Sequence, residues 1–193
     1  MLGRRQNGST ARAPRGSRRV LSAALLSAGL AGAAVAAPVS DTLVKATYLY
    51  KLAPFVEWPG GALGSSGGPF SICVVGHDPF GAVLDQAAAG QQVGGRPIVI
   101  RRVPTGAPIL GCAIAYLGGS PQAVHEALLG MGDAPVLTVT DGAAGGGVID
   151  LVLVKDHERF RIDEAQAVAR HLKLGSQLLG LALSVNRARG GRP

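Results

Sequence analysis

The sequence predicts an α/β fold in which a mostly parallel β-sheet lies between two layers of helices. The first observation is a set of short apolar runs that are rich in β-branched residues and bounded by glycine or proline, which is typical of strands covered on both faces. The second is that these runs alternate with helical segments as far as residue 140, which favours right-handed parallel crossovers. The third is composition. Of 193 residues 47% are hydrophobic but only 4% are aromatic, so the core must be mostly aliphatic.

The first predicted elements are a helix and a buried strand. Apolar residues recur at helical spacing over 41–58, with Asp41 as the N-cap and Pro54 as a kink or an end of the regular part. The apolar run at 70–76 predicts the first strand. A second helix is expected over 78–89, and a glycine-containing turn at 90–95 follows it.

Three more strands and one helix follow in alternation. Strands are expected at 97–103, 112–117 and 135–140. Between the last two, Ser120 is placed to cap a helix that has proline at its first position and ends near Leu129. In a doubly wound order the first and third strands are neighbours, so the prediction is a Rossmann/flavodoxin-like three-layer sheet.

The C-terminal part of the chain changes character. Apolar runs at 148–154 and 159–162 flank a polar turn at 155–158, which predicts an antiparallel hairpin. Two closing helices are expected after it. Asp163 caps the first, which ends near Leu172. The second begins at Ser176 and runs to about Val185.

The first 37 residues are expected to be a signal peptide. A basic region precedes an apolar stretch, and Ala34-Val35-Ala36 offers a small-x-small cleavage pattern. Both the general secretory and the twin-arginine routes fit this leader, and an uncleaved membrane anchor is the alternative. The α/β domain is then expected over 38–186, outside the cytoplasm, with a disordered tail at 187–193.

The net charge of +7 overstates how basic the domain is. Six of the 19 basic residues lie in the leader and no acidic residue precedes Asp41. From Pro38 onward 13 basic residues therefore stand against 12 acidic ones. A nearly neutral domain gives no reason to expect nucleic acid as a partner.

The two cysteines are predicted to form a disulfide. Cys73 lies in the first strand and Cys112 opens the third, and the doubly wound order makes these strands neighbours. An exported chain also enters a compartment in which disulfides persist. A structural bridge is the favoured interpretation, and a redox-sensing bridge stays open. Nucleophilic catalysis would need an exposed thiolate beside a base, which a buried strand does not offer.

Other candidate residues carry weaker signals, and no pattern predicts a metal or a cofactor. Five arginines either converge on an anion or are ordinary surface charges: Arg96, Arg101, Arg102, Arg159 and Arg161. Phe55 and Trp58, at the kinked end of the first helix, fit an interaction patch and a core position equally well.

A series of motifs resembles the YfiR-like periplasmic family in the order in which they occur. The resemblance covers about Leu43 to Leu183. The segments that carry it are 44–51, 55–59, 70–76, 94–98, 112–117, 135–140, 160–162 and 172–179. Each motif is weak alone, whereas their joint order is specific.

This resemblance implies a non-enzymatic regulator. A YfiR protein holds a membrane-bound diguanylate cyclase inactive by binding its periplasmic domain, and an outer-membrane lipoprotein relieves the inhibition. The expected partners are therefore the periplasmic domain of such a cyclase or of a sensor protein, with an outer-membrane lipoprotein and a homodimer as further options. Cys73 and Cys112 match one disulfide of the family, and its second cysteine pair has no counterpart here.

A second hypothesis is a small-ligand receptor or a periplasmic enzyme. The carboxyl ends of parallel strands are the default ligand crevice of this fold class. Such a site would need polar groups that converge there, for which Arg96, Asp78 and the loop at 140–146 are the candidates.

Overall fold

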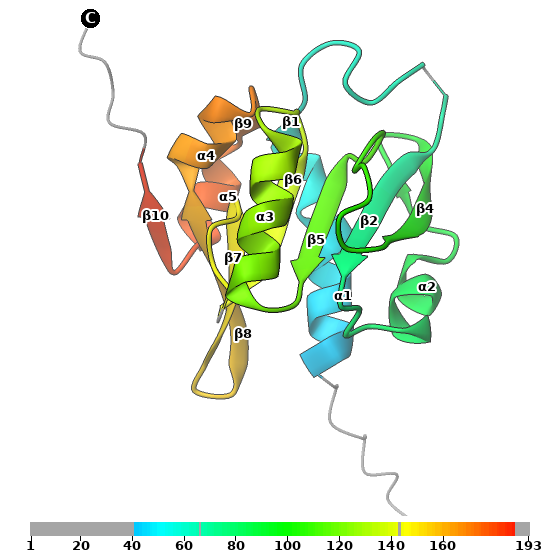
Figure 1. Cartoon of the computed structure of the whole chain (residues 1–193). Helices are drawn as coiled ribbons and strands as arrows, with labels where there is room; N and C mark the ends of the chain where they lie inside the picture. Colours follow the sequence, from blue (N-terminus) through cyan, green and yellow to red (C-terminus); the bar gives the residue numbers. More distant parts are fainter. Residues whose placement is uncertain (1–40, 66, 143, 188–193) are drawn as a thin grey trace, which may run out of the picture. The chain divides into compact units, whose positions relative to one another are not determined.

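The computed structural model describes residues 41–65, 67–142 and 144–187 (Figure 1). The expected signal peptide lies outside these residues, as does the expected tail from residue 188 onward. The described residues form an eight-stranded sheet in the order β10-β8-β7-β6-β5-β2-β4-β3. Its strands are β2 (Phe70–Gly76), β3 (Gln92–Val93), β4 (Arg96–Val103), β5 (Ile114–Gly118), β6 (Leu137–Asp141), β7 (Ile149–Val154), β8 (His157–Asp163) and β10 (Ser184–Asn186).

The centre of the sheet is parallel and doubly wound, as predicted. β2 pairs in parallel with β4 on one side and with β5 on the other, and β5, β6 and β7 continue in parallel. The first and third long strands are therefore neighbours, and the direction of winding reverses between β2 and β5. β7 and β8 form the predicted antiparallel hairpin.

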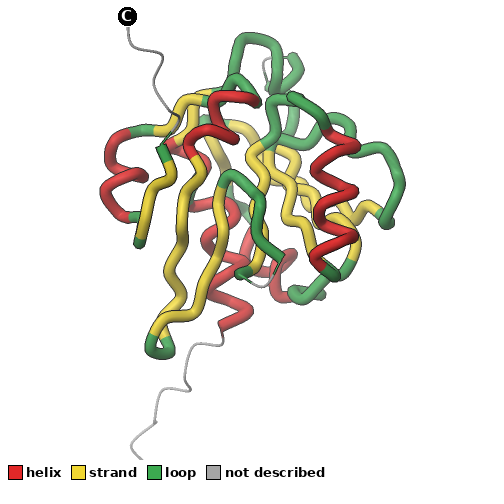
Figure 2. The backbone as a smooth tube through the Cα atoms, turned by 60° about the vertical axis from the view of Figure 1, so that its left-hand side comes forward, coloured by secondary structure: helices red, strands yellow, loops and turns green. Residues whose placement is uncertain are grey.

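Helices cover the two faces of the sheet unequally. α1 (Asp41–Lys51), α2 (Ala82–Ala88) and α5 (Ser176–Leu181) pack on one face, where Leu49, Leu84 and Leu178 are fully buried in one cluster. α3 (Pro121–Met131) packs on the other face, through Val124 and Met131. This gives the three layers that the sequence predicts. In Figure 2 the sheet is strongly twisted, and the β7–β8 hairpin runs past the helices.

The first helix is shorter than predicted. It ends at Lys51 and is followed by a 3-10 turn, η1 (Ala53–Phe55), and by a short strand, β1 (Val56–Glu57). Proline cannot donate the hydrogen bond that would continue the helix, and it disfavours helical backbone at the residue before it. β1 instead pairs antiparallel with β9 (Lys173–Leu174), forming a two-stranded ribbon. Neither of these strands was predicted.

The second helix also begins later than expected. The carboxylate of Asp78 accepts hydrogen bonds from the backbone N–H groups of Phe80 and Gly81, so it caps a turn that precedes the helix. Gly81 has a φ of 49°, which is not helical. In α3, by contrast, the predicted cap is confirmed, because the hydroxyl of Ser120 accepts a hydrogen bond from the N–H of Ala123.

The C-terminal elements are shorter than predicted, and the last is of another type. Asp163 caps α4 (Glu164–Ala169) as expected, but the helix ends before Leu172. The segment 182–185, expected as helix, leaves α5, and its last two residues begin the edge strand β10 (Ser184–Asn186). That strand pairs in parallel with β8, and the N–H of Leu183 donates to the carbonyl of Phe160. Pairing with a distant strand outweighs the local helical pattern here.

Candidate functional site

The predicted disulfide is present in the structure. Cys73, in the middle of β2, is bonded to Cys112, and their Cα atoms lie 5.8 Å apart. Both residues are buried, so the bond is enclosed in the core between the sheet and α3. One detail differs from the prediction, because Cys112 lies two positions before β5 rather than within it. Neither sulfur is an available nucleophile, since both are consumed in the bond.

The expected convergence of Arg96, Asp78 and the loop at 140–146 does not occur. Arg96 begins β4 and therefore lies at the amino-terminal edge of the parallel strands, opposite the ligand crevice. Asp78 follows the carboxyl end of β2, but its carboxylate pairs with Nε of Arg102 at 2.8 Å. The prediction was wrong because strand polarity places the first residue and the last residue of neighbouring strands on opposite edges.

Arg96 and Trp58 hold parts of the fold together. Nη1 of Arg96 donates to the carbonyls of Leu63, Ser65 and Gly68 at 2.9–3.1 Å, so it fastens the glycine-rich loop before β2. Nε1 of Trp58 donates to the carbonyl of Ala113 at 3.2 Å. Both side chains line a shallow hollow of about 700 Å³ at this edge.

The aromatic pair proposed as an interaction patch packs largely inward. The ring of Trp58 lies edge-to-face on Phe70, with centroids 5.5 Å apart. Phe55 is half-buried and packs against the same core cluster, and its carbonyl accepts from the N–H of Gly175. The contacts favour the core interpretation of both residues, and whether either one binds a partner stays a prediction.

Arg159 and Arg161 lie together on an open face. They alternate with the buried Phe160 and Ile162 along β8, so both point to the same face of the sheet as α3. On that face α3 covers other strands and not β8. Both arginines are exposed there, because none of the described helices covers this part of the sheet. Arg161 approaches the carboxylate of Asp150 on β7 at 3.9 Å, which is a loose ion pair. Within the described part of the chain no side chain pairs with Arg159.

A partly buried charge network lies on the opposite face and was not predicted. Nζ of Lys45 on α1 contacts the carboxylates of Asp141 at 2.6 Å and Glu158 at 3.4 Å, and the Glu158 side chain is only 2% exposed. Burial raises the pKa of the Glu158 carboxyl, although the Lys45 charge opposes the shift. Its Oε2 atom has no hydrogen-bond partner.

The carboxyl edge of the sheet is thus rich in negative charge. Burial raises the pKa of the Tyr116 phenol, and the charges of Asp141, Asp78 and Glu158 act in the same direction. One sequence signal could have shown that Glu158 points inward, because it has the same parity along β8 as Phe160.

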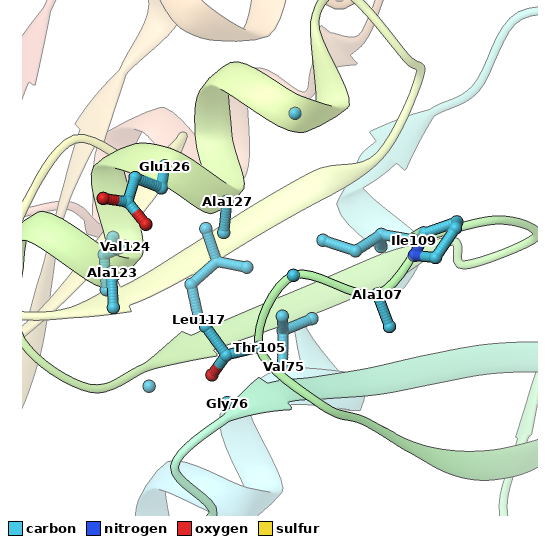
Figure 3. A pocket seen from close by; sticks show the side chains of 14 residues that line it. Val75, Gly76, Thr105, Ala107, Ile109, Leu117, Ala123, Val124, Glu126 and Ala127 are labelled. Atoms are coloured by element: carbon cyan, nitrogen blue, oxygen red, sulfur yellow. The ribbon is translucent and has the colours of Figure 1, made fainter.

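A cavity of about 300 Å³ lies at this same edge, between α3 and the loop that follows β4. Figure 3 shows Val75 and Leu117 on its floor, Ala107 and Ile109 on the loop side, and Ala127 on the helix side. The cavity is mostly apolar. Among the described residues, no three His, Cys, Asp or Glu side chains gather in a way that would hold a metal ion.

Comparison with protein families identifies the family of the chain. A family model described as YfiR/HmsC-like matches residues 42–183, which is more than half of the chain. No curated protein matches. Over the residues that the structure describes, the helices are too short or too polar to cross a bilayer.

Proposed function

The chain belongs to the YfiR/HmsC-like family, and from this premise we propose that it is a periplasmic regulator of cyclic-di-GMP synthesis. In this proposal it represses a membrane diguanylate cyclase by binding the periplasmic domain of that enzyme, and thereby controls biofilm formation. An outer-membrane lipoprotein would relieve the repression. The buried disulfide supports the assigned compartment, because such bonds persist in the oxidising periplasm.

The observation that carries the contact mechanism is the open face of β8. Arg159 and Arg161 stand two positions apart on one side of the strand, so their side chains emerge about 7 Å from each other. Only one of them has a carboxylate nearby, at the outer limit of an ion pair. Two exposed guanidinium groups on a rigid strand fit a partner surface that presents carboxylates, which each group can bind through two hydrogen bonds.

A contact of this kind needs no chemistry from the chain. The two arginines are held by the hairpin, since β7 and β8 are paired from Ile149–Ile162 to Val154–His157. The backbone that carries them is therefore fixed before binding, which lowers the entropic cost of association. Repression then depends on occupancy of the cyclase domain and is sensitive to changes of charge on this face.

The test combines a deletion with charge reversal. Deletion of the gene should raise cellular cyclic-di-GMP and biofilm, and the wild-type gene should reverse both effects. The R159E/R161E double variant should fail to do so and should no longer retain the periplasmic domain of the cyclase in a pull-down. The control is K51E/K173E, which changes the net charge equally at exposed positions on α1 and β9. Unchanged cyclic-di-GMP and biofilm after deletion would refute the regulatory role. A double variant that binds like wild type would refute the assigned surface.

A further inference from the structure

The cavity between α3 and the loop after β4 lies where the winding of the sheet reverses. Its floor is formed by the last residues of β2 and β5, among them Val75 and Leu117. This is the point at which open α/β sheets leave a crevice at the carboxyl ends of their strands. The family match does not assign a role to this place.

Two features keep the cavity open. On the helix side its lining residues include Ala123, Ala127 and Gly130, whose side chains are too small to reach the facing loop. On the other side the loop is fastened at its end, because Cys112 is bonded to β2 and Nη1 of Arg101 donates to the carbonyl of Leu110 at 2.7 Å. The walls are thus fixed by covalent and hydrogen bonds, as in most preformed ligand sites.

The lining specifies the chemistry of an occupant. Aliphatic side chains and glycines make up most of it, and Thr105 adds one hydroxyl. Of the described residues that line it, Glu126 alone is charged. It lies exposed on α3, where its Oε1 accepts a hydrogen bond from Nε2 of Gln122. Among the described residues no basic side chain lines the cavity, so an anionic ligand would find no side-chain counter-charge there, and Glu126 would repel it.

We propose that this cavity binds a small amphiphilic amine, with its apolar body between Leu117 and Ile109 and its ammonium group at the mouth beside Glu126. Size agrees with a small molecule. An engineered cavity of about 150 Å³ holds benzene, so twice that volume accommodates roughly a dozen non-hydrogen atoms. A helix of a partner protein, about 10 Å across, is too wide to enter.

The negative charge of the surrounding edge favours the same occupant. Asp141 is the last residue of β6, and Glu158 on β8 lies beside the carboxyl end of β7. Both carboxylates share the single ammonium group of Lys45. The two acidic groups Asp78 and Asp85 likewise share Arg102. A cation approaching this edge therefore meets more carboxylates than basic groups. The proposal does not depend on whether the chain represses a cyclase.

The test uses three probes with the same tail and different head groups: n-heptylamine, 1-heptanol and heptanoate. Each is titrated into the purified protein while the backbone amide signals of Gly76, Gly106 and Gly118 are followed by NMR. We expect the amine to bind most tightly and the carboxylate least. Glu126→Gln should lower the affinity for the amine about threefold, to that of the alcohol, as is typical of an exposed ion pair.

A cavity-filling variant with a matched control locates the site. A Cβ atom added at Gly130 meets nothing within 4 Å, so Gly130→Leu can place its side chain in the cavity and should weaken amine binding at least tenfold. Gly180→Leu, at an equally open helical position on α5, should leave binding unchanged. If Gly130→Leu does not fold, Ala127→Val serves as the filling variant. Failure of the amine to shift these signals, tighter binding of heptanoate, or full binding by the filled variant would each overturn the proposal.

Discussion

Reduction of the Cys73–Cys112 bond should destabilise the domain by about 4 kcal/mol. The bond joins residues 39 positions apart, and the chain-entropy model assigns a loop of that length about 13 cal/mol/K. At 25 °C this entropy corresponds to about 4 kcal/mol, a large part of the roughly 5–15 kcal/mol by which a domain is usually stable. The bond is buried between β2 and α3, so reduction also leaves two thiols that must be repacked.

The measurement is urea unfolding of the oxidised protein and of protein reduced in denaturant and refolded with a phosphine reductant. Fluorescence of Trp58, the only tryptophan, reports the transition because its ring packs on Phe70 at the start of β2. The m-value should rise on reduction, since the unfolded chain is no longer cross-linked. A Cys73→Ala/Cys112→Ala variant controls for other effects of the reductant and should not respond to it. A difference below about 1 kcal/mol between the oxidised and reduced forms would refute the entropic account.

Three further predictions concern groups with defined contacts. Burial raises the pKa of the Glu158 carboxyl above its ordinary value of 4.5, so the folded protein holds this proton more tightly than the unfolded chain does. The free energy of unfolding of the wild type, relative to that of Glu158→Gln, should therefore fall as the pH rises through the folded pKa. A difference in urea unfolding that does not vary with pH would contradict this. Lys45→Met leaves that buried carboxylate unpaired and should cost about 3 kcal/mol in the same assay, whereas a cost near zero would show that the ion pair contributes nothing. Asp163→Ala removes the cap of α4 and should lower the free energy of unfolding by about 1 kcal/mol, with faster amide exchange at Gln166 as the local readout, and unchanged exchange would argue against the cap.

The elements that could be predicted are those with a local physical cause. The run at 70–76 has the composition of a covered strand, and Ser120 and Asp163 sit where a helix needs an acceptor for its first N–H groups. The neighbouring positions of the first and third strands follow from the doubly wound order, and with them the disulfide.

The missed elements depend on partners far away in the sequence. β1 and β9 have two residues each and are defined only by pairing with each other. β10 follows a helical pattern but completes the edge of the sheet beside β8. Nothing local indicates such strands, because their hydrogen bonds come from residues that tertiary structure alone brings near.

The candidate site divides in the same way. Strand parity was enough to place Arg159 and Arg161 on one face. It could not show that Arg96 is occupied by three backbone carbonyls, because those come from a loop with no regular pattern. The cavity beside α3 was equally hidden, since it results from small side chains opposite a loop whose course is set by the disulfide.

The ribbon of β1 and β9 can form only late in the synthesis of this domain. Val56 lies near the beginning of the described chain, and its partner Leu174 follows more than a hundred positions later. A nascent polypeptide that emerges from its amino end can therefore pair β1 with β9 only when almost all of the sequence has been synthesised. Loss of β9 and the elements after it would leave β1 unpaired and the C-terminal side of the core uncovered, so truncated forms should be degraded by proteases rather than persist as partly active fragments.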